Sequence, residues 1–84
     1  MILKVFTKEE DGITEEALGF CADLEEEFKV EYLDLDSAEA TGQAEIYQIF
    51  NSPSFVVTSD DGREITSWRG ILPTSDEVKN YLRQ

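Results

Sequence analysis

The chain has 84 residues, of which 19 are acidic and 7 basic, so its formal net charge is −12 at pH 7. A chain of this length is expected to form one domain, residues 1–84, around a single modest core, and its charge would repel nucleic acid and anionic lipid. Because it contains one cysteine and no histidine, an internal disulfide, a cysteine metal cluster and imidazole chemistry are excluded.

The first half of the sequence has a strand, helix, strand pattern. Residues 2–6, Ile-Leu-Lys-Val-Phe, predict a buried strand. From Thr14 to Phe28 the apolar residues recur at intervals of three and four, which predicts an amphipathic helix. Residues 29–36 return to strand character and are so continuously apolar that we expect both faces to be buried. Two strands joined through a helix are expected to be parallel, with a right-handed crossover.

The second half predicts a weaker helix followed by a hairpin. Ser37 is expected to open a short helix that Gly42 interrupts. The Ser-Asp-Asp-Gly turn at residues 59–62 separates two predicted strands, residues 55–58 and residues 63–69, the second of which contains Ile65 and Trp68. Strands joined so closely must be antiparallel.

A last helix is predicted by a capping box. Thr74 and Glu77 have the spacing of a hydroxyl and a carboxylate that cap a helix start together. Its apolar positions would be Val78, Tyr81 and Leu82. The predicted order of elements is therefore β-α-β-α-β-β-α.

The chain is organised around the stretch that joins the second helix to the hairpin. Residues 46–58 read Ile-Tyr-Gln-Ile-Phe-Asn-Ser-Pro-Ser-Phe-Val-Val-Thr. Proline cannot donate to a sheet ladder, so Pro53 belongs where a loop becomes a strand. The stretch resembles the segment Tyr-Gly-Ile-x-Ser-x-Pro-Thr of the thioredoxin superfamily. Tyr47 and Ile49 match it, and Pro53 and Ser54 stand where that superfamily has a cis-proline and a small hydroxyl residue.

The resemblance covers nearly the whole chain and implies a thioredoxin-like or glutaredoxin-like α/β fold. This is a three-layer sandwich: a mixed four-stranded sheet with the first and third helices on one face and the second on the other. Gly70 stands where the superfamily usually carries a glycine bulge. Gln48 departs from the pattern, because the superfamily tends to have glycine there.

The redox motif of the superfamily is missing. The resemblance implies a Cys-x-x-Cys pair at the start of the first helix, where the helix dipole lowers a thiol pKa. Counting from the first strand places it on residues 11–14, and counting from the helical stripe places it on residues 14–17; neither contains a cysteine. Lys8 fits a glutaredoxin-like glutathione site, but residues 69–73 lack its double glycine. We expect no cofactor and a redox-inactive domain.

The single thiol, Cys21, has two interpretations. It is a weak catalytic candidate for a thiol-disulfide oxidoreductase that acts through one cysteine or with a partner's cysteine. The favoured interpretation is a small core residue, because Cys21 lies inside the predicted helix on its apolar face.

The other chemistry-bearing residues have structural interpretations. The run Glu25 to Glu27 is a solvated helix face, and Asp34 with Asp36 marks a strand end, with no base or nucleophile beside either. A hairpin turn explains residues 60–61 more simply than Ca²⁺ or Mg²⁺ binding, so we predict no metal site. We expect the aromatic residues Trp68 and Tyr81 to be core residues.

The predicted function is that of an interaction module. By the resemblance, its binding surface would consist of Ile13, Phe50, Ser52, Pro53 and Gly70, with an exposed Phe50 as the anchor for a protein or peptide.

The scattered acidic residues are typical of a solvated surface, and docking to a basic partner and solubility at high salt are the functional alternatives. We expect a monomer or weak homodimer; a structural homodimer with Phe50 and Trp68 in its interface is the third hypothesis. Neither a membrane span nor a leader is recognisable, which predicts a cytoplasmic protein.

Overall fold

The computed structural model of the chain describes residues 1–8 and 14–83, and the backbone alone for residues 14–18. The elements within these residues have the order that the sequence predicts. They are β1 (Ile2–Thr7), α1 (Thr14–Glu25), β2 (Lys29–Asp34), α2 (Ala38–Tyr47), β3 (Ser54–Thr58), β4 (Glu64–Arg69) and α3 (Ser75–Leu82).

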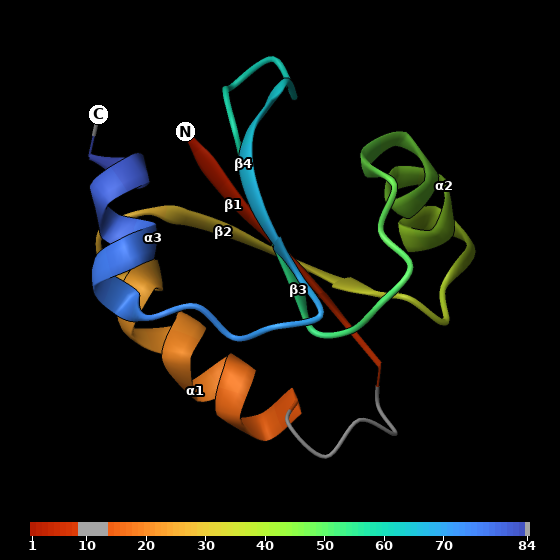
Figure 1. Cartoon of the computed structure of the whole chain (residues 1–84), viewed down its shortest axis with the longest axis horizontal. Coiled ribbons are helices and arrows are strands. Elements are labelled where there is room, and N and C mark those ends of the chain that lie inside the picture. The colour runs from red at the N-terminus through yellow and green to blue at the C-terminus, as the bar shows by residue number, and fades with distance from the viewer. Residues whose placement is uncertain (9–13, 84) are drawn as a thin grey trace.

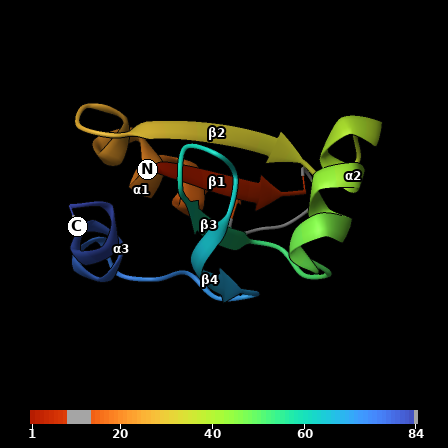
Figure 2. The same cartoon turned by 90° about the horizontal axis from the view of Figure 1, so that it is seen from above.

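The strands form one mixed sheet in the order β2-β1-β3-β4, as Figure 2 shows. β1 is parallel to β2 and antiparallel to β3, and β3 and β4 are antiparallel, which confirms the predicted parallel pair and hairpin. The expectation of a bulge at Gly70 is wrong, because the irregularity in the pairing of β3 with β4 lies elsewhere. The register of the hairpin shifts between Val57 and Thr58, and Gly70 follows the last residue of β4 with a φ of 75°.

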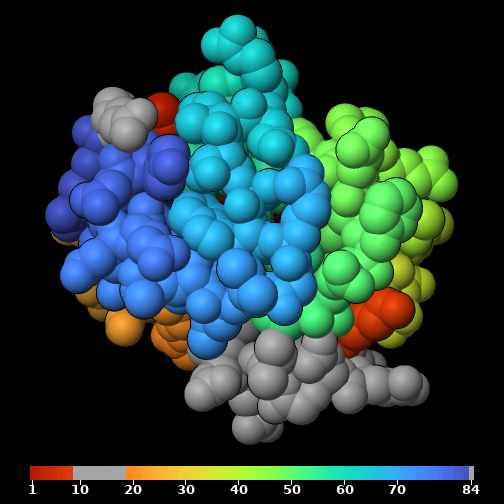
Figure 3. All heavy atoms as spheres, in the orientation of Figure 1, coloured from red at the N-terminus to blue at the C-terminus, as the bar shows by residue number. Residues whose placement is uncertain are grey.

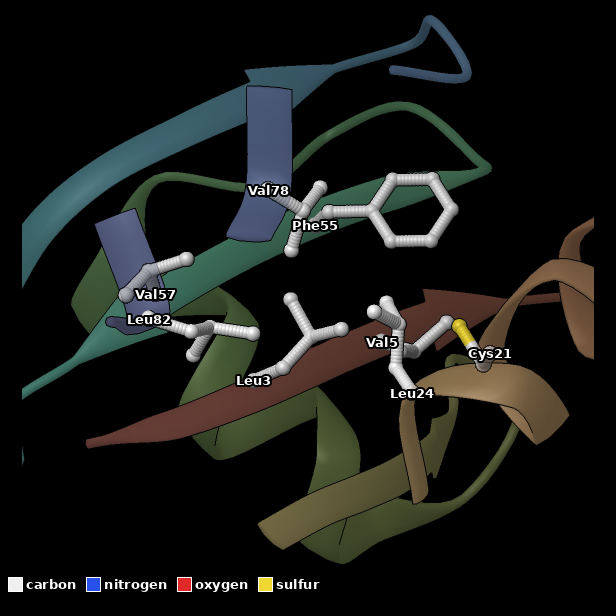
Figure 4. Close-up of a cluster of buried hydrophobic side chains, with 8 residues drawn as sticks. All are labelled: Leu3, Val5, Cys21, Leu24, Phe55, Val57, Val78 and Leu82. Atoms are coloured by element: carbon white, nitrogen blue, oxygen red, sulfur yellow. The ribbon is translucent and has the colours of Figure 1, made fainter. Parts of the chain in front are cut away.

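The helices cover the two faces of the sheet, with α1 and α3 on one side and α2 on the other (Figure 1). Because side chains alternate along a strand, Leu3 and Val5 of β1 pack toward α1 and α3, and Phe6 packs toward α2. The core on the first face consists of Leu3, Val5, Cys21, Leu24, Phe55, Val57, Val78 and Leu82 (Figure 4). The core on the second face consists of Phe6, Leu33, Ala40, Ala44, Tyr47, Ile49 and Val56.

The expectation that both faces of residues 29–36 are buried is wrong. β2 is an edge strand, and Lys29, Tyr32 and Asp34 are exposed. The strand also ends at Asp34 because this residue begins a turn. Its carboxylate accepts a hydrogen bond from the amide of Asp36, and its carbonyl accepts one from the amide of Ser37, both at 2.9 Å.

α2 is continuous through Gly42, so the predicted interruption is also wrong. Ser37 caps the helix as predicted: its side chain accepts a hydrogen bond from the amide of Ala40. The helix ends at Gln48, which adopts the left-handed conformation with a φ of 56°. The amide of the next residue, Ile49, then bonds the carbonyl of Ala44 at 2.7 Å, which directs Ile49 into the core.

α3 begins as the capping-box spacing predicts. Thr74 is the N-cap, and its hydroxyl accepts a hydrogen bond from the amide of Glu77 at 3.2 Å. Trp68 and Tyr81 are only partly buried. Their rings pack edge to face with centroids 5.8 Å apart, against the core that α1 and α3 cover.

Candidate functional site

The proline elbow, residues 50–54, is fixed to the end of β4 by hydrogen bonds. The peptide bond between Ser52 and Pro53 is cis. The amide of Gly70 donates to the carbonyl of Pro53 at 3.0 Å and to the hydroxyl of Ser54 at 3.1 Å. The Ser54 hydroxyl donates in turn to the carbonyl of Asn51 at 2.7 Å. Two segments that are far apart in the sequence therefore meet at one end of the sheet (Figure 1).

The predicted binding surface is only partly accessible. Phe50 is 80% exposed, as the interaction hypothesis requires, and Gly70 is exposed too. Pro53 is buried and Ser52 half-buried, and Ile13 lies outside the described residues.

Two apolar residues that the sequence analysis missed extend the accessible part. Ile71 is 59% exposed, and its neighbour Leu72 is exposed to a smaller extent. In Figure 3 the atoms that follow β4 lie beside those that precede β3. We call Phe50, Gly70, Ile71 and Leu72 the elbow surface. A signal was present in the sequence, because the run Gly70-Ile71-Leu72-Pro73 places apolar residues in a loop, where polar ones are more usual.

A pocket lies beside the elbow surface, and the sequence analysis did not predict it. Its volume is about 260 Å³. Its walls come from the end of β1, the segment after β2, one face of α2 and the segment that follows α2. We call it the α2 pocket, and it is lined by Lys8, Leu35, Thr41, Ala44, Glu45, Ile49 and Phe50.

The local structure explains how these residues come together. Thr41, Ala44 and Glu45 are three and four positions apart, so they share one face of α2. The amide of Leu35 bonds the carbonyl of Thr7 at 2.9 Å, which holds the segment after β2 against the end of β1. Phe50 belongs to both the pocket and the elbow surface.

A partly buried cation lies under α2. The Lys4 side chain is only 12% exposed, and its ammonium lies 3.1 Å from the Glu31 carboxylate and 2.7 Å from the side-chain oxygen of Gln43. It also lies over the Tyr47 ring, 5.8 Å from the centroid. These partners satisfy Lys4, so we regard it as a structural residue.

Solved structures give a consistent answer about the fold. The chain is similar to thioredoxin 1 of Thermosipho africanus, with a TM-score of 0.78, 14% identity and coverage of 99% of this chain and 96% of that one. It is similar to Fasciola hepatica thioredoxin, with a TM-score of 0.76, 20% identity and coverage of 98% and 77%. A Thermus thermophilus thioredoxin gives a TM-score of 0.68, 24% identity and coverage of 99% and 71%.

The chain has the thioredoxin fold. No protein-family model matches the sequence, and no curated protein matches it significantly. At these identities the likeness extends to the fold, and function must be argued from the site. No helix in residues 14–83 is both long and apolar enough to cross a membrane.

Within this thioredoxin fold, the thiol is placed unfavourably for exchange chemistry. Cys21 lies about two turns into α1, has no exposed surface and points toward Val5 and Leu24 (Figure 4), so the prediction of a core cysteine is confirmed. Burial, and to a smaller extent the Glu25 carboxylate, raises the pKa of the thiol to about 12. Thiolate is the reactive form, and at neutral pH this thiol stays protonated.

Proposed function

We propose that this chain is an interaction module of thioredoxin fold that binds a protein or peptide segment through the elbow surface without thiol-disulfide exchange. The observation that carries the proposal is the exposure of Phe50, whose side chain is 80% open to solvent. Aromatic side chains are large, semi-rigid and enriched among the residues that dominate binding energy.

The hydrogen bonds of the elbow support the proposal. Ser54 and Gly70 join the segment that carries Phe50 to the segment that carries Ile71. A surface held in one conformation loses less conformational entropy when a partner binds. The backbone segments that carry Phe50 and Ile71 are therefore held against each other.

The oxidoreductase alternative needs an accessible thiol with a low pKa. The sequence has only Cys21, which has no exposed surface and a raised pKa. The homodimer alternative needs two copies to associate although each carries a charge of −12. This charge favours a separate, basic partner over a second copy.

Selection from a library of displayed random peptides tests the proposal, with the full chain as bait. Selected peptides are then titrated against Phe50→Ser and Ile71→Ser. Tyr32→Ser is the matched control, because Tyr32 is an exposed aromatic residue on the distant edge strand β2. We expect Phe50→Ser to weaken binding by at least about tenfold, which corresponds to one buried aromatic contact, and Tyr32→Ser to leave it unchanged. Peptides that bind Phe50→Ser as tightly as wild type would contradict the proposal.

A reductase assay tests the absence of exchange chemistry separately. The full chain is added to a small disulfide substrate with dithiothreitol as the electron donor. We expect the same reduction rate with wild type, Cys21→Ala and buffer. A rate that depends on Cys21 would establish the oxidoreductase alternative.

A further inference from the structure

The α2 pocket extends the elbow surface toward β1. The inference drawn from it rests on the proposed function and specifies the kind of partner further. The pocket volume of about 260 Å³ lies below the range of roughly 300–1,000 Å³ that is typical of sites for whole drug-sized ligands. Leu35, Ala44 and Ile49 give it apolar walls. A space of this size and lining suits one apolar side chain of a larger partner.

The charges beside the pocket define the partner further. Glu45 lines it from α2, and the exposed Asp34 and Asp36 stand on either side of Leu35. Lys8 lines it from the β1 side. The carboxylates would attract a cation over about one Debye length, roughly 8–10 Å, and the charge of −12 adds to this attraction. The positive charge of Lys8 repels a cation nearby, so we expect a bound cation on the side of the pocket formed by α2.

We propose that the α2 pocket receives one apolar side chain of a protein segment that carries lysine or arginine next to that side chain. The apolar side chain enters between Leu35 and Ile49, and the basic residue lies beside Glu45. Phe50 covers the segment where it continues from the pocket to the elbow surface. A second copy of this chain does not fit this description, because its surface is acidic as well.

The probe is a blocked synthetic peptide with a central leucine, a pair of lysines directly on each side of it and a glycine at each end. It is titrated into the isotopically labelled full chain and followed by NMR. We expect saturable shifts at Leu35, Ala44 and Ile49. Replacing the leucine of the probe by alanine should weaken binding by at least about tenfold, because one side chain is no longer buried. Replacing the lysines by glutamates should abolish binding.

Variants of the chain test the pocket and its charge separately. Thr41 is exposed on α2 and lines the pocket, so Thr41→Phe should fill the space and weaken binding by at least about tenfold. Glu45→Gln should weaken binding about two- to fivefold, the size of one exposed ion pair. Glu39→Gln is the matched control: Glu39 is exposed on the same helix and does not line the pocket. It should leave affinity unchanged.

The outcomes separate this inference from the proposed function. If probe binding survives Thr41→Phe and the loss of the leucine but is removed by Phe50→Ser and Ile71→Ser, the pocket inference is wrong and the elbow surface stands. If Thr41→Phe and Phe50→Ser remove binding but Ile71→Ser does not, the pocket is a binding site. The elbow surface as defined above would then be wrong, because Ile71 would not contribute to binding. If Glu45→Gln and Glu39→Gln weakened binding equally, the proposed position of a basic residue beside Glu45 would be wrong. No saturable shift in the millimolar range would overturn the inference as a whole.

Discussion

The amide of Gly70 donates a hydrogen bond to the hydroxyl of Ser54 at 3.1 Å, and this contact joins the end of β4 to the start of β3. The same hydroxyl donates to the carbonyl of Asn51 at 2.7 Å. One small side chain thus connects the turn before Pro53 with the two strands of the hairpin. The conformation of the elbow surface depends on this side chain, although Ser54 itself is fully buried and lies below that surface.

Ser54→Ala should destabilise the protein by about 1 kcal/mol, because a buried hydroxyl that both donates and accepts is lost. The free energy of unfolding in urea measures the effect. Ser75→Ala is the control, because Ser75 is exposed at the first position of α3, where Thr74 is the cap. It should change stability by less than about 0.5 kcal/mol. Equal effects of the two substitutions would show that the Ser54 contacts do not stabilise the elbow.

Two glycine-to-alanine substitutions should have opposite effects on the free energy of unfolding. At Gly70 the φ of 75° is unfavourable for alanine, and the added Cβ would lie 3.2 Å from the Cβ of Asn51, so Gly70→Ala should cost about 1–2 kcal/mol. At Gly42, in the middle of α2, an added Cβ meets nothing within 4 Å, so Gly42→Ala should stabilise by about 0.5–1 kcal/mol. Thermal unfolding of both variants tests the pair. A destabilised Gly42→Ala would contradict the continuous helix.

The sequence allowed the order of elements to be predicted, because that order depends on local patterns, and the placement of the helices on the two faces of the sheet followed from the resemblance. The periodicity of residues 14–28 and the turn at residues 59–62 are readable without tertiary information. The position of β2 at the sheet edge cannot be read in this way, since it depends on which strands occupy the centre of the sheet. The four apolar residues among residues 29–36 are compatible with both an edge and a central strand.

The site was predictable to a smaller extent for the same reason. The exposure of Phe50 followed from its place beside Pro53 in the resemblance. The α2 pocket did not follow, because it combines Lys8, Leu35 and Ile49 from segments that only the folded chain brings together. Gln48 illustrates a local exception. The helix end needs a left-handed residue there, and glutamine adopts that conformation where glycine is more usual.

The partly buried ammonium of Lys4 should stabilise the fold less than its aliphatic stem does. Replacing a satisfied buried charge with an apolar side chain of similar volume is often nearly neutral, so Lys4→Met should lie within about 1 kcal/mol of wild type. Lys4→Ala also removes the stem that packs beside Tyr47 and should be about 2 kcal/mol less stable than Lys4→Met. Urea unfolding of the two variants distinguishes the contributions. If both variants lost the same stability, the ion pair with Glu31 would be the dominant interaction.

Cys21 should make stability depend on pH in the alkaline range. The thiol has an ordinary pKa of 9.0 and a folded-state pKa of about 12. Between these values the unfolded chain releases the thiol proton while the folded chain keeps it. The folded state then binds more protons, so the free energy of unfolding falls as the pH rises, by at most about 1.4 kcal/mol per pH unit.

The matched variant for this prediction is Cys21→Ala, which lacks the titrating group. At neutral pH it should be about 1 kcal/mol less stable than wild type, because a buried atom is deleted. As the pH rises from about 8 to about 10, the advantage of wild type should shrink and disappear. Alkylation of the folded protein should be slow throughout, and fast once it is denatured. A constant stability difference across this range, together with rapid alkylation of the folded protein, would show that the thiol is accessible and ionises normally, which would contradict its assignment as a core residue.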